Sequence, residues 1–331
     1  MAIDIFNIEP TVISRDLKGK YMLLYGKPKC GKTSFSAQMP RNLLIAFEKG
    51  YNAISGIRPV DIAKWSDFKL VLRQLEKPEA RQMYDSITID TLTIAWQLCE
   101  EFVCAQNGVQ KIGDIPWGGG YAACKKEFES ALRKITMLGY GLLMMTHVSR
   151  RVEVDKDGSE KEILSPDMPK RAAEIANGLV DIIGYIGVEF QGPEDIHGTR
   201  YLYTRETPTI FAGSRFRHLA PKIPFGYNEL VNAIADAIEK SENIDGAVVV
   251  DQQTHRVEEK LDYAAIRNEA ATLWHQLVGE GETMNEEMAR RILKRVEMIF
   301  GRPMRLSEIT EDQVDLYHLV VMDMRELAQE A

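Results

Sequence analysis

The segment from Gly26 to Thr33 constrains the fold more than any other part of this 331-residue chain. It reads G-x-x-x-x-G-K-T and directly follows residues 21–25, an apolar run short enough to be a buried strand. A strand that leads into such a loop is typical of the P-loop, whose backbone N–H groups surround a polyphosphate. The sequence therefore predicts a nucleotide site whose binding residues are Gly26, Lys27, Pro28, Lys29, Cys30, Gly31, Lys32, Thr33 and Ser34.

Two residues of this loop have expected roles in binding ATP and Mg²⁺. Lys32 is expected to reach the β- and γ-phosphates, and Thr33 is expected to ligate the metal ion. A helix that opens at Lys32 would direct the positive end of its dipole at the phosphates. Cys30 occupies a variable position of the loop, and we interpret it as a filler rather than a redox group.

Composition and targeting signals suggest a folded cytoplasmic protein. Hydrophobic residues make up 45% of the chain, enough for one α/β domain with an appendage. No apolar run approaches the roughly 20 residues of a spanning helix, and the N-terminus lacks a signal-like pattern, so no membrane partner is expected. The four cysteines form no C-x-x-C pair, which favours a reducing cytoplasm.

Negative charge is concentrated in the last quarter of the chain. Residues 241–331 carry 10 Lys and Arg against 19 Asp and Glu, a net charge of −9, which leaves +1 for residues 1–240. A nearly neutral core argues against a broad DNA-wrapping surface but permits a local basic loop.

The order of apolar segments predicts an α/β fold. Strands expected at 42–47, 86–90 and 141–146 alternate with helices at 91–104 and 122–138. Because each strand is a nearly continuous apolar run, the sheet should be parallel and covered on both faces. The later extended segments suggest an antiparallel extension that a helix at 228–240 closes. These segments are 179–190, 199–205 and 208–212.

The chain is expected to divide into a core at 1–240, a linker at 241–257 and an acidic three-helix module at 258–331. Thr310 begins a T-x-x-Q capping box and is expected to be a helix N-cap. The module helices are expected at 258–278, 285–300 and 311–328.

Polar residues follow the predicted strands at the edge where ligands of parallel sheets bind. Asp90 is expected to hold Mg²⁺ with Thr33, and its alternative role is a helix N-cap. Glu48 is expected to orient a water towards the γ-phosphate, unless it is an exposed charge that ends a strand. His147 is expected to contact the γ-phosphate and report its loss, or else to be a capping or exposed histidine.

The loop after His147 has interleaved polar and apolar residues around Asp157-Gly158, a strong hairpin signal. Basic side chains on this loop are suited to gripping a phosphodiester backbone, although acidic residues in the same hairpin favour a solvated surface nearly as well. A second loop at 114–121 combines glycines with Trp117 and Tyr121, which are either a base-stacking platform or aromatic anchors. The DNA-binding candidates are Arg150, Arg151, Lys156 and Lys161.

Arg215 and Arg217 lie two residues apart on an extended segment, so their side chains share one side. Facing the nucleotide of a neighbouring subunit, one of them would stabilise transition-state charge as an arginine finger. Facing water, they would form an ordinary basic edge.

The order of these features resembles the RecA-type ATPase core. More closely, residues 8–240 are similar to the phage-encoded RecA-like P-loop ATPases of the single-strand annealing recombination (Sak-type) family. The similar stretches are LLYGKPKCGKT, LLIAFEKG, SITID, the loop at 116–119, LLMMTH and residues 212–224. The resemblance implies that Glu48 is the catalytic glutamate, that His147 replaces a glutamine sensor, and that Arg215 or Arg217 acts across a subunit interface.

The resemblance also implies a function. It indicates a RecA-like core that hydrolyses ATP, binds single-stranded DNA and promotes annealing or strand pairing in the cytoplasm of a bacterial host. The implied partners are single-stranded DNA, further copies of the chain in a ring or filament, and a single-strand-binding protein. Lys29-Cys30 departs from the small residues usual in this loop, and residues 258–331 lie outside the resemblance.

Three other functions are compatible with a P-loop. A small-molecule kinase would need an arginine-rich substrate lid and would have no use for Glu48 as a water-activating base. A helicase-type or packaging motor shares the same core. A nucleotide-gated binding module with negligible turnover is the alternative outside the enzymes.

Overall fold

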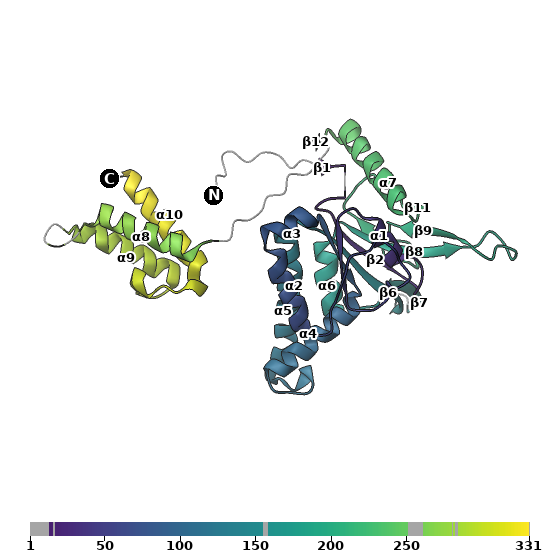
Figure 1. The fold of residues 1–331 in the computed structure, drawn as a ribbon, viewed down its shortest axis with the longest axis horizontal. Helices are drawn as coiled ribbons and strands as arrows, with labels where there is room; N and C mark the ends of the chain where they lie inside the picture. Colours follow the sequence, from purple (N-terminus) through teal and green to yellow (C-terminus); the bar gives the residue numbers. More distant parts are fainter. Residues whose placement is uncertain are drawn as a thin grey trace. The chain divides into compact units, whose positions relative to one another are not determined.

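The computed structural model describes residues 13–15, 17–154, 158–250, 261–279, 281 and 284–330. The chain forms two compact units, one that extends to Val257 and one that begins at Glu258 (Figure 1). Lys156, one of the DNA-binding candidates, lies outside the described residues, as do residues 1–12 of the expected core and residues 251–257 of the expected linker.

A ten-stranded sheet, counted over the described residues, is the centre of the larger unit. Its main path has the order β11-β9-β8-β2-β6-β5-β3-β4, while β10 pairs with β8 and β7 pairs with β6. The pairs from β8 through β2, β6, β5 and β3 to β4 are parallel, and β9, β11, β10 and β7 join antiparallel. The strands are β2 (Tyr21–Gly26), β3 (Asn42–Ala46), β4 (Pro59–Asp61), β5 (Ser86–Asp90), β6 (Gly141–Val154), β7 (Glu160–Pro166), β8 (Ile182–Glu189), β9 (Thr199–Tyr203), β10 (Gly213–Ser214) and β11 (Lys222–Pro224).

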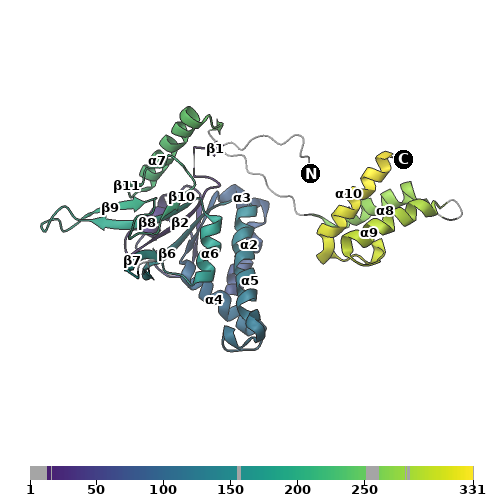
Figure 2. The same cartoon turned by 180° about the vertical axis from the view of Figure 1, so that it is seen from behind.

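Both faces of the sheet are covered because its central strands are apolar on both sides. Leu23 and Ile89 lie in one buried cluster, and Leu24 and Leu44 lie in another. The first cluster is covered by the helices α2 (Trp65–Leu75), α4 (Leu92–Gln106), α5 (Gly119–Met137) and α6 (Lys170–Leu179), seen together in Figure 2. The second is covered by α1 (Lys32–Gln38) and α7 (Tyr227–Lys240). The predicted α/β class, mainly parallel with an antiparallel extension, is confirmed.

Several expected segments take another form. The segment expected to be extended from residue 179 begins as the last residue of α6, because α6 carries its alanines into the first cluster. Residues 208–212 form no strand, and their pairing there consists of isolated bridges at Ile210. Residues 51–85, for which the sequence pattern predicted no element, form β4, α2 and the short α3 (Pro78–Met83).

The beginning of the expected linker is also structured. Ser241–Asp245 forms a π-helical turn that continues α7, and β12 (Val249–Val250) pairs with β1 (Ile13–Ser14). The Asp245 carboxylate accepts hydrogen bonds from Arg217 and His218, at 3.0 and 2.8 Å, which holds this turn on the core. The expectation of a linker from residue 241 is therefore wrong for residues 241–250.

The smaller unit contains three helices among its described residues: α8 (Tyr263–Leu277), α9 (Glu286–Phe300) and α10 (Val314–Glu330). They enclose their own apolar cluster, which includes Ile292 and Val320. The capping box at Thr310 is present, since its backbone N–H donates to Gln313, although it opens a 3₁₀ turn that precedes α10. Within the described residues, no helix combines the length and apolar character that crossing a bilayer requires.

Candidate nucleotide site

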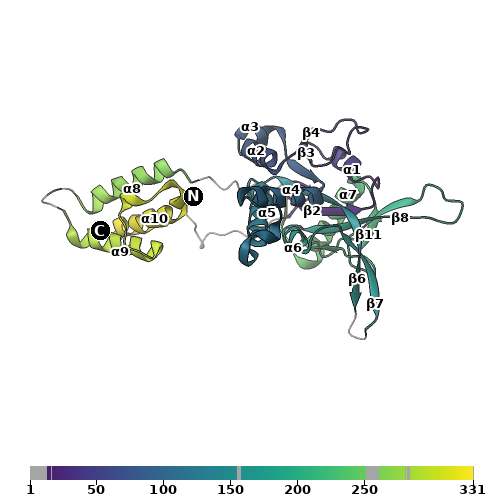
Figure 3. The same cartoon turned by 90° about the horizontal axis from the view of Figure 1, so that it is seen from below.

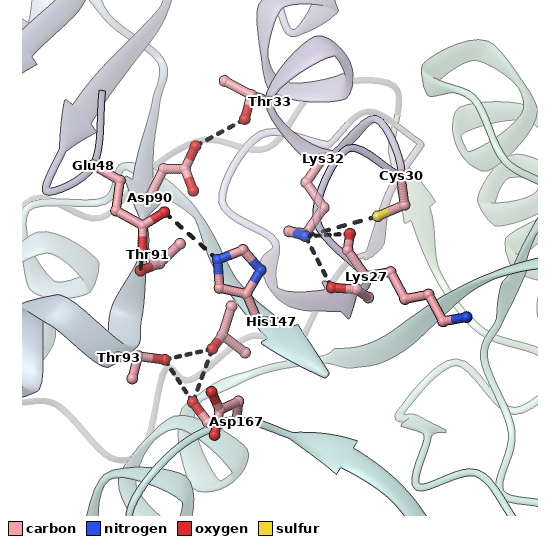
Figure 4. A network of polar contacts seen from close by, with 12 residues as sticks. Lys27, Cys30, Lys32, Thr33, Glu48, Asp90, Thr91, Thr93, His147 and Asp167 are labelled. Atoms are coloured by element: carbon pink, nitrogen blue, oxygen red, sulfur yellow. Dashed lines mark hydrogen bonds and ion pairs between the residues drawn. The ribbon is translucent and has the colours of Figure 1, made fainter. Parts of the chain in front are cut away.

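The site lies where β2, β3 and β5 end, because the register aligns their last residues. Gly26 pairs with His147 of β6, and Asp90 pairs with Ala46 and Met145. The P-loop, the Asp90 carboxylate, Glu48 and His147 therefore meet at one edge of the sheet (Figure 4). The sequence predicted this meeting from strand ends alone.

The P-loop lysine is folded back on its own loop. Nζ of Lys32 donates to the carbonyl oxygens of Gly26 and Lys27, at 3.0 and 3.1 Å, and lies 3.7 Å from Sγ of Cys30. The Lys32 side chain is buried, and these contacts hold its ammonium group against the backbone of the loop. A phosphate in the loop would receive this cation together with the backbone N–H groups.

Thr33 and Asp90 form the second part of the site. The Thr33 hydroxyl donates to Oδ2 of Asp90 at 2.8 Å. Burial raises the pKa of Asp90, and the Thr33 hydrogen bond and the Lys32 charge partly oppose that rise. A buried carboxylate with a raised pKa beside a hydroxyl oxygen fits a divalent cation, which would favour the ionised form. Thr33 and Asp90 would hold Mg²⁺, which would neutralise phosphate charge.

Glu48 is held between two neighbours at the end of β3. The hydroxyl of Thr91 donates to its Oε1 at 2.9 Å, and Nε2 of His147 lies 3.5 Å from its Oε2. Backbone N–H of Glu48 donates to the carbonyl oxygen of Asp90 at 3.1 Å. The Glu48 carboxylate is thus fixed beside Asp90, and a carboxylate held in this way can polarise a water molecule.

His147 connects this site to the strand that follows it. Its Nδ1 is buried and has no hydrogen-bond partner among the described residues, which leaves one ring nitrogen for a ligand. Next to it, the hydroxyl groups of Thr93 and Thr146 lie 2.7 Å apart, and both reach the carbonyl oxygen of Asp167. The backbone N–H of Asp167 donates to the His147 carbonyl oxygen at 2.9 Å, so hydrogen bonds link the site to the residue that follows β7. Figure 4 shows the side chains of this region.

The predicted hairpin is confirmed. β6 and β7 pair antiparallel from Val148 with Pro166 to Val154 with Glu160, and the hairpin extends away from the sheet (Figure 3). Arg150 forms an exposed ion pair with Glu162 at 3.3 Å, while Arg151 donates to the carbonyl oxygen of Met168 at 3.1 Å. The two arginines are neighbours in a strand and so project from opposite faces. Lys161 is exposed on β7.

Arg215 and Arg217 lie near the amino-terminal ends of the parallel strands, opposite the ends that carry the site. Ser214 pairs with Ile182, the first residue of β8, whereas the P-loop follows the last residue of β2. Arg215 binds Asp181 at 3.2 Å and the Gly178 carbonyl oxygen at 2.9 Å. Within one chain these arginines are therefore apart from the P-loop, and an arginine-finger role requires a second subunit.

Comparison with known proteins identifies the family. A family model described as "AAA domain" matches residues 18–216, more than half of the chain, including the P-loop, Glu48, Asp90 and His147. The chain belongs to the AAA domain family. This family consists of P-loop ATPases, which generally use ATP with Mg²⁺. The chain is also similar to the SPbeta prophage-derived uncharacterized protein YorG of Bacillus subtilis (strain 168), with 30% identity over 342 aligned residues and 100% of both chains covered.

Two residues of this AAA domain that adjoin the site were not predicted from the sequence. Thr91 fixes Glu48, and the signal for it was its position directly after the strand that ends in Asp90. Arg200 lies against the P-loop from β9. Its position depends on pairing between β9 and β8, which residue spacing does not reveal.

Proposed function

We propose that the protein is an ATPase that binds single-stranded DNA and promotes annealing or strand pairing in phage DNA recombination. The observation that carries the ATPase part is the convergence of Lys32, Thr33, Asp90, Glu48 and His147 at one edge of the sheet. Phosphoryl transfer to water needs a phosphate cradle, a metal site and a base that positions the water, and this edge offers each of them. The similarity to a prophage-derived protein supports the phage context.

A basic and aromatic surface next to the site supports the DNA part. Arg151 reaches Met168, two residues before α6 begins, and the guanidinium group of Arg171 lies 4.4 Å from the ring centroid of Tyr121 on α5. Trp117, in the preceding loop, is fully exposed. Single-stranded DNA binds to such combinations through phosphate contacts and base stacking. DNA bound to this surface would lie near the hydrogen bond between Thr146 and Asp167. DNA binding would thereby be coupled to the neighbouring His147.

ATP hydrolysis with and without single-stranded DNA tests the proposal. We expect DNA to raise the turnover rate of the full-length protein at least about threefold, and added salt to weaken DNA binding steeply. Arg150→Glu together with Arg151→Glu should lower DNA affinity at least about tenfold and leave ATP affinity unchanged.

The control for this pair is a substitution with the opposite effect. Glu162→Gln removes the partner of Arg150 and should raise DNA affinity, because it frees a cation on the same strand pair. If hydrolysis does not respond to DNA, or if the double variant binds DNA as wild type does, the DNA part of the proposal is wrong. ATP-dependent phosphorylation of a small molecule in place of hydrolysis would favour a kinase.

A shared site between copies of the chain is the second part of this proposal. Arg215→Ala/Arg217→Ala protein and Glu48→Gln protein should each hydrolyse ATP poorly alone. Mixing them should restore activity, because mixed interfaces combine an intact arginine pair with an intact Glu48. The measurement is the hydrolysis rate as a function of mixing ratio. No recovery, with a monomeric mass in ATP and Mg²⁺, would refute the shared site.

A further inference from the structure

Arg200 lies directly against the phosphate loop. A Cβ atom placed on Gly31 would lie 3.0 Å from Nη1 of Arg200 and 3.4 Å from Cε1 of Phe225. Gly31 has a φ of +102°, a backbone conformation that favours glycine, and the Arg200 side chain lies close to the position that a Cβ atom would take. The Arg200 guanidinium group is therefore part of the wall around the P-loop.

Three separate parts of the chain build this wall. Arg200 on β9 pairs with Val188 of β8, and the backbone N–H of Phe225 donates to the Arg200 carbonyl oxygen at 2.9 Å. The Phe225 ring stacks on Phe35 of α1, with centroids 5.4 Å apart and an interplanar angle of 17°. Since α1 begins at the P-loop, these contacts fix the backbone of β9 beside the loop.

The charge at this wall is uncompensated. Arg200 is exposed, and its guanidinium group makes no hydrogen bond or ion pair within the described part of the chain. The adjacent loop adds Lys27, Lys29 and Lys32, and none of these lysines forms an ion pair with a described carboxylate. Arg200 and these lysines give the P-loop and its wall a positive potential, which attracts a polyphosphate.

The order of the strands indicates which part of a nucleotide Arg200 would meet. β8 and β9 lie on one side of β2, whereas Asp90, Glu48 and His147 come from β5, β3 and β6 on the other side. A nucleotide whose terminal phosphate faces Glu48 would have its inner phosphates nearer the β9 side. We propose that Arg200 binds the α- and β-phosphate oxygens that ATP and ADP share. This inference rests on the proposed nucleotide site.

The test measures the affinities of full-length protein for ATP, ADP and inorganic pyrophosphate. Arg200→Ala should raise the Kd of all three ligands at least about tenfold, because each loses a charge-assisted hydrogen bond. The kcat at saturating ATP should stay within about threefold of wild type, because a contact made equally in the bound state and the transition state affects binding alone. Arg200→Lys should retain part of the affinity.

Arg133→Ala is the matched control, since Arg133 is an exposed arginine paired with Glu129 one turn away on α5. A thermal melt of each variant without nucleotide verifies folding. Unchanged affinities in Arg200→Ala, with wild type binding ATP, would refute the role of Arg200 alone. Weaker ATP and ADP binding with unchanged pyrophosphate binding would move the contact to the nucleoside, and a lower kcat with unchanged Kd would move it to the transition state. If wild type binds no ATP, the nucleotide site itself is wrong.

Discussion

Glu48→Gln protein is expected to bind ATP as wild type does and to lose at least about 100-fold in kcat. The amide keeps the size of the side chain and still accepts the hydrogen bond from Thr91, which holds the group in place. It cannot take a proton from water, so the chemical step alone is affected. The measurements are steady-state hydrolysis and equilibrium binding of ATP.

The control for this substitution is Glu129→Gln, which removes a carboxylate from the surface ion pair with Arg133 on α5. It should hydrolyse ATP at the wild-type rate. Turnover by Glu48→Gln within about threefold of wild type would show that another group positions the water.

Lys32→Ala is expected to raise the Kd of ATP at least about 30-fold, because the loop loses its buried cation. A ligand that binds only the folded state raises the melting temperature in proportion to the logarithm of its concentration over Kd. Wild-type protein should therefore show a clear ATP-dependent rise in melting temperature, and Lys32→Ala protein should show nearly none at the same concentration.

Lys18→Ala is the matched control for Lys32→Ala. Lys18 precedes β2 and pairs with Asp85 at 3.5 Å, at the end of the strand away from the P-loop. Its removal should leave the ATP-dependent rise intact. A full ATP-dependent rise in the Lys32→Ala protein would mean that the nucleotide binds elsewhere.

The sequence predicted the strand ends that form the site better than the elements that surround them. Ser86–Asp90 forms a strand as predicted, and Glu48 and His147 lie beside it, because local apolar runs determine where buried parallel strands end. Helix α2 was not predicted from the sequence, although it has an apolar face whose Trp65 and Phe68 are buried in the first cluster. The helix begins at Trp65, and its N-cap is Lys64, which is not a usual capping residue.

Contacts between distant segments explain the rest of what the sequence did not reveal. Arg200 reaches Gly31 only because β9 returns beside β8, and Thr204 is buried where its hydroxyl donates to the Ala220 carbonyl oxygen at 2.5 Å. The two-residue β10 has no periodicity that could predict it, since it exists through pairing with β8. Residue spacing describes neighbours along the chain, and these features depend on neighbours across it.

The length of β6 gives the region around His147 a mechanical property. Residues 141–147 of this 14-residue strand are paired with β2 or β5, whereas residues 148–154 are paired with β7 alone. The base of this hairpin is anchored, because Leu164, the partner of Arg150, bonds to Thr209 and Phe211 through its backbone. Residues 151–154 extend beyond that anchor as a lever of roughly 13 Å, at about 3.3 Å per residue. A tilt of about 10° at its base would displace the far end by about 2 Å. A rearrangement too small to disturb the buried sheet would thus become a movement comparable to a hydrogen-bond length at the tip.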